Sequence, residues 1–344
     1  MRAGLFLAYW PWFSLEEQLS LARLGDELGL DSVWVSEAWG QDAVSVLSML
    51  AGRTERIALG SGLLQIPARA PAAAAMAAAS LDVLSGGRFR LGLGVSGPQV
   101  SEGWYGVPFA RPLRRTREYV EIVRMALARR TLRYEGDEWT LPLPGGEGRA
   151  LKLLARPVQD RIPIYLGAVG PKAVEQAGEI ADGWLPLMLD PAAPEILMGA
   201  LGRGLARAGR ARGDIDVAPC VPFAVAADRD AARDAVRPWL AFYLGGMGSR
   251  EKNYYVDAAT AAGFGAPARA CQDAYLEGDR NGAAAALTPA LIDAMALATT
   301  PAGLDDRLAA YERAGVDTLV AVPCGDDKQG ALETLAAAMG TVGA

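Results

Sequence analysis

Histidine is absent from this chain of 344 residues. Imidazole is the side chain whose charge changes most readily near neutral pH, and it is a common zinc ligand. Its absence excludes Ser-His-Asp and Cys-His catalysis, zinc sites of the HExxH type and any acid–base step that uses imidazole. A proton donor must therefore be sought among other side chains or in solvent.

Cysteine and long apolar runs are also scarce. The three cysteines, Cys220, Cys271 and Cys324, form no CxxC pair, so we expect neither a disulfide framework nor a metal site. The first residues, MRAGLFLAYWPWF, are too short an apolar run to span a membrane and lack a signal-peptide cleavage pattern. A net charge of −6 argues against nucleic acid as the main partner. These features predict a cytoplasmic protein that binds neither nucleic acid nor membrane.

Short apolar segments alternate with helical patterns along the chain, which is typical of parallel strands joined by helices. The predicted strands are residues 3–8, 32–35, 57–64, 89–95, 164–168, 184–188, 217–226 and 316–322. This count predicts an α/β fold, a (β/α)8 TIM barrel formed by residues 1–344 as a single domain. Residues 229–314 are mainly helical, and we expect them to be an insertion between strands seven and eight that caps the carboxyl-terminal face.

Two local signals sharpen this prediction. Ser14 and Glu17 have the spacing of a capping box, which predicts a helix over residues 15–28. The sequence TLRYEGDEWTL, from residue 131, predicts a hairpin between the fourth helical connection and strand five.

Glycine-rich sequences follow the third and fourth predicted strands, where a barrel places its active site. Gly60 and Gly62 in LGSGLLQIPARAP would let the backbone lie against a planar ring, although close packing explains them equally well. The sequence LGLGVSGP, residues 91–98, resembles a dinucleotide fingerprint. That fingerprint must lead straight into a helix, and we expect a loop with aromatic residues here, so a classical nucleotide-binding domain is disfavoured.

A candidate phosphate site follows the fifth predicted strand. The sequence IYLGAVGPKAVEQAG turns at Gly167, Ala168, Val169 and Gly170, and a helix begins at Pro171. Backbone N–H groups in the first turn of a helix have no partner within it, and the helix dipole attracts anions. Lys172 adds positive charge there, or is simply a solvated helix residue.

Aromatic and ionisable residues also gather at predicted strand ends. The aromatic set is Tyr9, Trp10, Trp12, Trp39, Trp104 and Tyr105, and the ionisable set is Glu37, Asp42, Arg69 and Glu102. Aromatic residues at loop positions favour a stacking pocket for a substrate, although rim packing explains any one of them. For each ionisable residue, a surface role is the simpler interpretation.

Several segments together resemble the bacterial luciferase-like monooxygenase superfamily, and specifically its coenzyme F420 (deazaflavin) dependent oxidoreductases. They are SVWVSEAWGQDA, IALGSGLLQIPARAP, LSGGRFRLGLGVSGPQVSEGWYGVPF, PLRRTREYVEIVR, IPIYLGAVGPKAVEQAGEIADGWLP and AGVDTLVAVP. They occur in the family's order over nearly the whole chain. The resemblance implies a barrel with a helical insertion after strand seven, F420 at its carboxyl-terminal mouth, and a homodimer.

The resemblance also implies roles for individual residues. A non-proline cis peptide that supports the deazaflavin ring would fall at Gly62–Leu63. The implied cofactor-binding residues are Glu37, Gly62, Leu63, Gln65, Ser96, Gly97, Gly167, Ala168, Val169 and Gly170, with Val169 and Gly170 holding the phosphate through backbone amides. The implied substrate-binding residues are Tyr9, Trp10, Trp12, Trp39 and Trp104.

The chain departs from the family pattern at catalytic positions. A sugar-phosphate dehydrogenase of this group has histidine where this chain has Ala38, and glutamate where it has Pro98. Tyr105 stands where histidine commonly follows EGW. That enzyme's acid–base step and substrate therefore do not carry over, and Tyr105 and Glu102 become the candidate proton donors, with solvent as a competitor.

The predicted function is hydride transfer between the deazaflavin and an activated C=C, C=N or C=O of a small or natural-product substrate. One alternative is a monooxygenase of the same fold that uses FMN. Another is a relative that binds the cofactor without turnover. The substrate is not evident from the sequence, and we expect Tyr243, Tyr254, Tyr255 and the glycines at 245–248 to shape its pocket.

Overall fold

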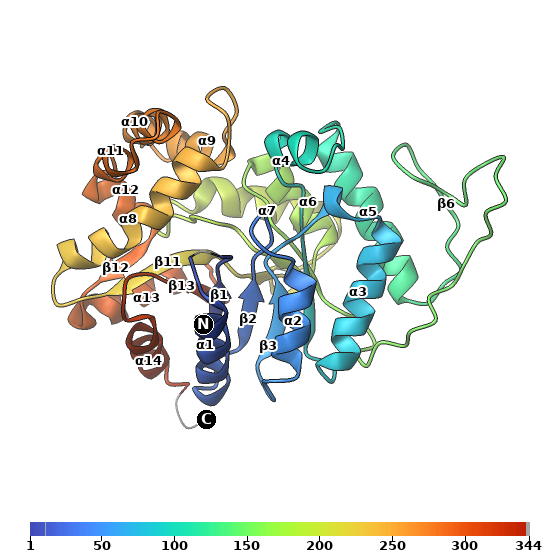
Figure 1. Cartoon of the computed structure of the whole chain (residues 1–344), viewed down its shortest axis with the longest axis horizontal. Helices are drawn as coiled ribbons and strands as arrows, with labels where there is room; N and C mark the ends of the chain where they lie inside the picture. The colour runs from blue at the N-terminus through green and yellow to red at the C-terminus, as the bar shows by residue number, and fades with distance from the viewer. Residues whose placement is uncertain (11, 342–344) are drawn as a thin grey trace.

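Most strands of the computed structural model, which describes residues 1–10 and 12–341, belong to one parallel sheet (Figure 1). They are β1 (Arg2–Leu7), β2 (Ser32–Val35), β3 (Ala58–Ser61), β4 (Leu64–Gln65), β5 (Phe89–Gly94), β8 (Ile164–Leu166), β9 (Gly183–Trp184), β10 (Asp216–Val217), β11 (Cys220–Val225), β12 (Leu297–Thr299) and β13 (Thr318–Pro323). The strand order is β10-β9-β8-β5-β3-β2-β1-β13-β11-β12, with β4 beside β5. A parallel bridge joins Leu187, after β9, to Cys220 in β11, so the sheet curls back on itself.

Helices surround this curled sheet and confirm the predicted α/β fold (Figure 1). Those that follow sheet strands are α1 (Leu15–Glu27), α2 (Ala43–Ala51), α3 (Pro71–Leu84), α4 (Pro98–Gly103), α5 (Pro112–Leu127), α6 (Pro171–Ile180), α7 (Glu195–Arg207), α13 (Leu304–Arg313) and α14 (Lys328–Ala338). Between β11 and β12 lie α8 (Arg229–Gly246), α9 (Tyr254–Ala261), α10 (Gly265–Leu276), α11 (Arg280–Ala285) and α12 (Pro289–Met295). The 3₁₀ turns are η1 (Ile66–Ala68), η2 (Arg212–Asp214) and η3 (Pro301–Gly303).

Local sequence signals explain how several of these elements begin. The capping box predicted for α1 is present: Glu17 N–H donates to Ser14 Oγ at 3.2 Å, and Ser14 N–H donates to the Glu17 carboxylate at 2.8 Å. The predicted hairpin is present as β6 (Tyr134–Glu135) paired with β7 (Thr140–Leu141). No helix within the described residues is long and apolar enough to cross a membrane.

Two local features differ from the sequence-based predictions. Helix α4 begins directly after Gly97, where the sequence predicts a loop, and Pro98 supplies the fixed φ that suits a first helical position. The strand predicted over residues 217–226 is interrupted, because β10 ends at Val217 and β11 begins at Cys220. Pro219 lies in the gap and has no N–H to donate to a neighbouring strand.

The interior of the curled sheet is filled by aromatic side chains. Trp34 on β2 meets Tyr165 on β8 edge to face, with ring centroids 4.8 Å apart. Gly60 and Gly183 leave the room for these rings, since a Cβ on either glycine would collide with Trp34 or Tyr165. The sheet therefore encloses packed side chains rather than a channel.

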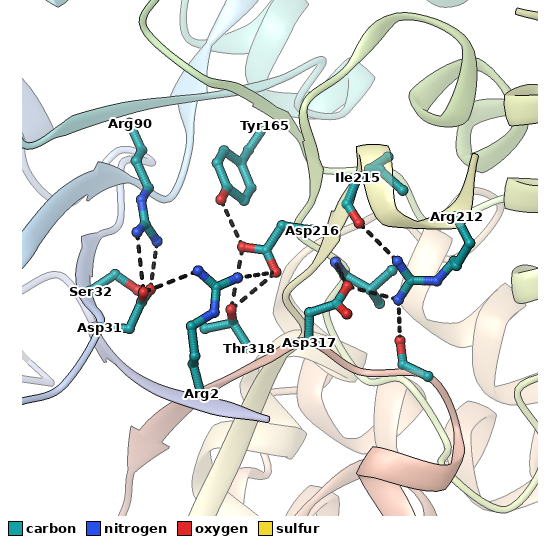
Figure 2. A network of polar contacts seen from close by, with 12 residues as sticks. Arg2, Asp31, Ser32, Arg90, Tyr165, Arg212, Ile215, Asp216, Asp317 and Thr318 are labelled. Carbon is teal, nitrogen blue, oxygen red and sulfur yellow. Dashed lines mark hydrogen bonds and ion pairs between the residues drawn. The ribbon is translucent and has the colours of Figure 1, made fainter. Parts of the chain in front are cut away.

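A network of charged side chains occupies the amino-terminal ends of the strands (Figure 2). The guanidinium of Arg90 donates to both carboxylate oxygens of Asp31, at 2.6 and 3.2 Å. Arg2 bridges Asp31 and Asp216 at 3.2 and 3.0 Å. The Tyr165 hydroxyl donates to Asp216 at 2.7 Å. Because each of these charges has an opposite partner, the network closes this end of the sheet at a reduced desolvation cost.

Candidate active site

A cavity of about 1130 Å³ opens at the carboxyl ends of the strands. Its walls are Tyr9 after β1, residues 36–39 after β2, Gly62, Leu63 and Gln65 after β3, residues 93–97 at the end of β5, residues 166–173 after β8, and residues of α4, α8 and α9. Ligand pockets commonly have volumes of roughly 300–1,000 Å³, so this space can hold more than one small molecule.

The floor of the cavity is built around Leu63. The Gly62–Leu63 peptide is cis, at the position that the family resemblance implies. The Leu63 side chain fills a slot between Gly92 and Gly94 on β5 and Gly167, which directly follows β8. A Cβ at Gly94 would lie 2.7 Å from Leu63 Cδ1, and one at Gly167 would collide with the same atom. Leu63 can occupy this slot because the three glycines around it have no side chains.

A buried ion pair holds the loop after β2 against the loop after β3. The carboxylate of Glu37, whose side chain is 3% exposed, accepts two hydrogen bonds of 2.8 Å from Arg69. It also accepts the backbone N–H of Gln65 at 3.0 Å, and the Gln65 amide donates to the Glu37 carbonyl at 3.1 Å. The side-chain oxygen of Gln65 is buried and has no hydrogen-bond partner among the described residues. Glu37 thus orients the Gln65 side chain. The Gln65 oxygen remains available to accept a hydrogen bond from a ligand.

The turn between β8 and α6 brings backbone amides to another wall. Residues 167–170 line the cavity, and Gly170 caps α6 with extended dihedrals, φ −84° and ψ 153°. Pro171 is the first helical residue, and the Lys172 side chain joins the same wall. A helix amino terminus with a lysine beside it is well suited to a phosphate group.

The wall beneath α8 and α9 is aromatic; we refer to Tyr9, Tyr243, Met247, Tyr254 and Tyr255 as the aromatic wall. The rings of Tyr243 and Tyr255 meet edge to face, with centroids 5.2 Å apart. Burial raises the pKa of the Tyr9, Tyr243 and Tyr255 phenols, so all three remain protonated at neutral pH. Tyr243, Tyr254 and Tyr255 line the cavity, in the pocket where the sequence analysis expects them.

Most residues expected at the site do line the cavity. From the expected cofactor set these are Glu37, Gly62, Leu63, Gln65, Ser96, Gly97, Gly167, Ala168, Val169 and Gly170, and from the expected substrate set Tyr9, Trp39 and Trp104. Trp39 and Trp104 are 45% and 65% exposed, so they stand at the rim. Ser96 has a left-handed φ of 62°, an uncommon conformation for a residue other than glycine.

Four residues expected at the site do not line the cavity: Trp10, Trp12, Glu102 and Tyr105. Trp12 packs against Trp239 and Phe242 of α8, with centroids 5.8 and 5.7 Å away, and Trp10 is 44% exposed. Both residues follow β1, as predicted, but Trp10 faces solvent and Trp12 packs against α8. Neither tryptophan lines the cavity, so their contact with a substrate stays a prediction.

The two candidate proton donors also lie outside the lining. The carboxylate of Glu102 accepts the backbone N–H of Phe109 at 2.9 Å and is exposed, because α4 turns this side chain away from the strand ends. Tyr105 is half-buried, and burial together with the negative charge of Glu37 raises the pKa of its phenol. Neither residue is among those that line the cavity, so their role as proton donors stays a prediction.

Sequence reasoning missed polar residues that also line the cavity, namely Ser36, Gln99, Thr116 and Gln176. Ser36 directly follows β2, so its position alone would have identified it. Gln99 lies on α4 and donates to the Lys252 carbonyl at 3.4 Å, which joins α4 to the segment before α9. Thr116 and Gln176 lie on α5 and α6, and only tertiary packing brings helix residues to a strand-end cavity.

Comparison with known proteins gives a consistent picture. The family model for luciferase-like monooxygenases matches residues 1–318. A Mycobacterium tuberculosis protein, provisionally named a coenzyme F420-dependent oxidoreductase, is 41% identical over 300 residues, which cover 85% of this chain and 86% of that protein. The 5,10-methylenetetrahydromethanopterin reductase of Archaeoglobus fulgidus is 31% identical over 341 residues, or 97% of each chain. The structure of the coenzyme F420 dependent tetrahydromethanopterin reductase from Methanopyrus kandleri superposes with a TM-score of 0.83 at 27% identity and covers 97% of each chain.

Proposed function

This chain belongs to the luciferase-like monooxygenase family, and on that basis we propose that it is a coenzyme F420-dependent oxidoreductase. The reaction class that fits is transfer of a hydride between the deazaflavin and an activated C=C, C=N or C=O of a small organic substrate. The names of the similar proteins support the cofactor, and the cavity supports a site for it.

One structural observation carries this proposal: a single cavity presents both a site for a polar ring and a site for a phosphate. Gln65 has a buried, unpartnered oxygen that would accept an N–H from the ring. Leu63 offers an apolar surface under it. Lys172 and the backbone amides after β8 would hold a phosphate. The residues present therefore fit the chemistry of the cofactor.

When bound, the deazaflavin supplies hydride transfer, and the chain supplies binding, orientation and a dry surface. Glu37 lines the cavity, and Arg69 holds its carboxylate, so the ion pair fixes the position of Gln65 beside it. Tyr105 and Glu102 lie outside the lining, so a proton donor must come from the aromatic wall or from solvent.

Helices α8 to α12 would complete the site as a cap inserted between the last two barrel strands. They follow β11 directly, and α8 and α9 supply the aromatic wall. We also propose that two copies of the chain associate, as the family resemblance implies.

Titration of the purified protein with oxidised F420 and, separately, with FMN tests the proposed cofactor. We expect F420 to bind more tightly, and Lys172→Ala to weaken it by about tenfold, the loss of roughly one charge-assisted hydrogen bond. Lys152→Ala, an exposed lysine between α5 and β8, is the matched control and should bind F420 normally. Tighter binding of FMN, with oxygen uptake by the reduced form, would instead identify an FMN monooxygenase. Binding of F420 without turnover of any carbonyl or imine would indicate that the chain binds the cofactor without catalysing a reaction.

A further inference from the structure

The aromatic half of the cavity carries no charge. Across the described residues, the charged side chains that line the cavity are Glu37 and Lys172. Glu37 is neutralised by Arg69, and Lys172 stands at the amino terminus of α6. The aromatic wall and its neighbours Leu185 and Leu187 are phenolic or apolar. An anionic group placed here would lose its hydration without gaining a cation, which is strongly unfavourable.

The hydroxyl of Tyr9 has a weak hydrogen-bond partner. Its side chain is 5% exposed, and its hydroxyl lies 3.9 Å from the sulfur of Met247. A thioether is a poor hydrogen-bond acceptor, so the Tyr9 proton is nearly unpaired. A carbonyl oxygen entering the cavity would accept that proton more strongly than sulfur does.

The geometry gives the direction of the Tyr9 proton. The hydroxyl donates toward the sulfur of Met247, and both residues line the cavity. A ligand oxygen that enters beside Met247 would therefore lie close to the Tyr9 hydroxyl.

We propose that Tyr9 is the hydrogen-bond donor that selects an uncharged, largely apolar, ring-bearing ketone or enone as substrate. This inference rests on the proposed function, since it assigns the second occupant of the same cavity. The aromatic wall packs against the substrate's ring system, and Tyr9 binds and polarises its carbonyl oxygen. Sugar phosphates and carboxylates are disfavoured, because the aromatic wall offers them no cation.

Three probes of matched shape test the proposal without requiring turnover. They are 2-acetylnaphthalene, 2-ethylnaphthalene and 2-naphthoate, which differ in carrying a carbonyl, no oxygen, or a charged carboxylate. Binding is measured by calorimetry on the protein without cofactor, in phosphate buffer, so that phosphate rather than the naphthoate occupies the wall beside Lys172. We expect the ketone to bind roughly 2- to 10-fold more tightly than the hydrocarbon, the value of one neutral hydrogen bond. The naphthoate should bind more weakly than both.

The Tyr9→Phe variant should remove the preference for the ketone and leave hydrocarbon binding unchanged. Tyr311→Phe is the matched control, because Tyr311 is a buried phenol of α13 that does not line the cavity. Tyr243→Phe is the second variant, and it should reduce the ketone preference less than Tyr9→Phe does, since it keeps the Tyr9 hydroxyl and its contact with Met247. Circular dichroism establishes that each variant is folded.

An unchanged ketone preference in Tyr9→Phe, or naphthoate binding as tight as the ketone, overturns the inference. Titration with F420 separates this failure from that of the proposed function. F420 binding without a ketone preference leaves the cofactor assignment intact and rejects Tyr9. A Tyr9-dependent ketone preference without F420 binding rejects the cofactor and keeps the substrate site.

Discussion

Asp31 is the carboxylate most tightly held by charge in the network at the amino-terminal strand ends (Figure 2). Burial alone would raise its pKa, but the hydrogen bonds and positive charge of Arg90, together with Arg2, outweigh burial and hold the pKa below its usual value. A carboxylate whose folded pKa is depressed stabilises the fold above its unfolded pKa of about 3.9. That contribution is lost as the pH falls through the lower, folded pKa.

We expect Asp31→Asn to destabilise the protein by about 3–5 kcal/mol at pH 7, because the mutation leaves the buried Arg90 guanidinium without its partner. Urea unfolding at pH 7 and at pH 3 measures the effect. The difference from the parent protein should shrink at pH 3, which lies below the unfolded pKa, because the unfolded parent then binds a proton at Asp31 and the folded carboxylate stabilises less. Asp234→Asn removes an exposed i,i+3 pair and should change stability by less than about 1 kcal/mol at either pH. A difference independent of pH would show that the Asp31 charge does not matter.

At the scale of elements, α6 and α7 cross in close contact. A Cβ on Gly204 of α7 would collide with the backbone carbonyl of Glu175 on α6, and one on Gly178 would lie 2.5 Å from the Leu201 carbonyl. The amino terminus of α6 forms the proposed phosphate wall. The close crossing that the two glycines allow therefore fixes the position of α6 and of its amino terminus.

Gly204→Ala should destabilise the protein by about 1–3 kcal/mol, since the added methyl forces the two backbones apart. Gly202→Ala, on the same helix, has no atom within 4 Å of the new methyl and should stabilise by about 0.5–1 kcal/mol through helix propensity. Thermal unfolding of both variants gives the comparison. Equal effects of the two changes would contradict the close crossing.

The slot around Leu63 gives a prediction for ligand binding rather than for stability alone. Gly167→Ala places a methyl where Leu63 Cδ1 now lies, so we expect the leucine to move into the cavity. F420 affinity should fall by at least about tenfold. Adding Leu63→Ala to Gly167→Ala should restore part of that affinity, because it returns the space. No recovery in the double variant would mean that the glycine acts through the backbone instead.

These elements also show what a sequence can reveal. The capping box at Ser14 and Glu17, the hairpin at 134–141 and the turn after β8 depend on residues close together in the chain, and each was predicted. The break at Pro219 was missed because the apolar pattern continues through it. Helix α4 was missed because six residues give too little periodicity to recognise.

At the scale of the whole molecule, an arm formed by residues 131–160 extends from the side opposite α8 to α12 (Figure 1). It exposes three leucines, Leu143, Leu151 and Leu154, which are 72%, 71% and 91% exposed. Exposed apolar groups on an extended segment commonly mark a protein–protein contact. We expect the arm to contribute to the proposed homodimer.

Leu154→Asp should shift the protein toward monomer, as measured by light scattering coupled to gel filtration. The charged side chain would be buried without a partner in the dimer interface, and this is unfavourable. Lys152→Asp changes the charge of an exposed neighbour on the same arm and should leave the dimer largely intact. A parent protein that is already monomeric at micromolar concentration would rule out the dimer.

The candidate site was predictable only where strand order alone determines position. Residues directly after β2, β3, β5 and β8 converge in any sheet of this kind, and Glu37, Gln65 and Gly170 do line the cavity. Trp10 and Trp12 follow β1 in the same way, yet the loop path turns them aside. Residues reaching the site from helices, such as Gln176, had no signal in the sequence because their placement depends on long-range packing.

The polar network and the cavity occupy opposite ends of the strands, and this separation bears on engineering. Arg2, Asp31 and Asp216 stand where strands begin, whereas the aromatic wall comes largely from α8 and α9, beyond the strand ends. A mutant library confined to residues 243–255 would vary the substrate wall without touching the charges that close the sheet. Leu244 and Asn253 are buried within this segment, so the library is best restricted to Met247 and Tyr254, which line the cavity and are only partly buried.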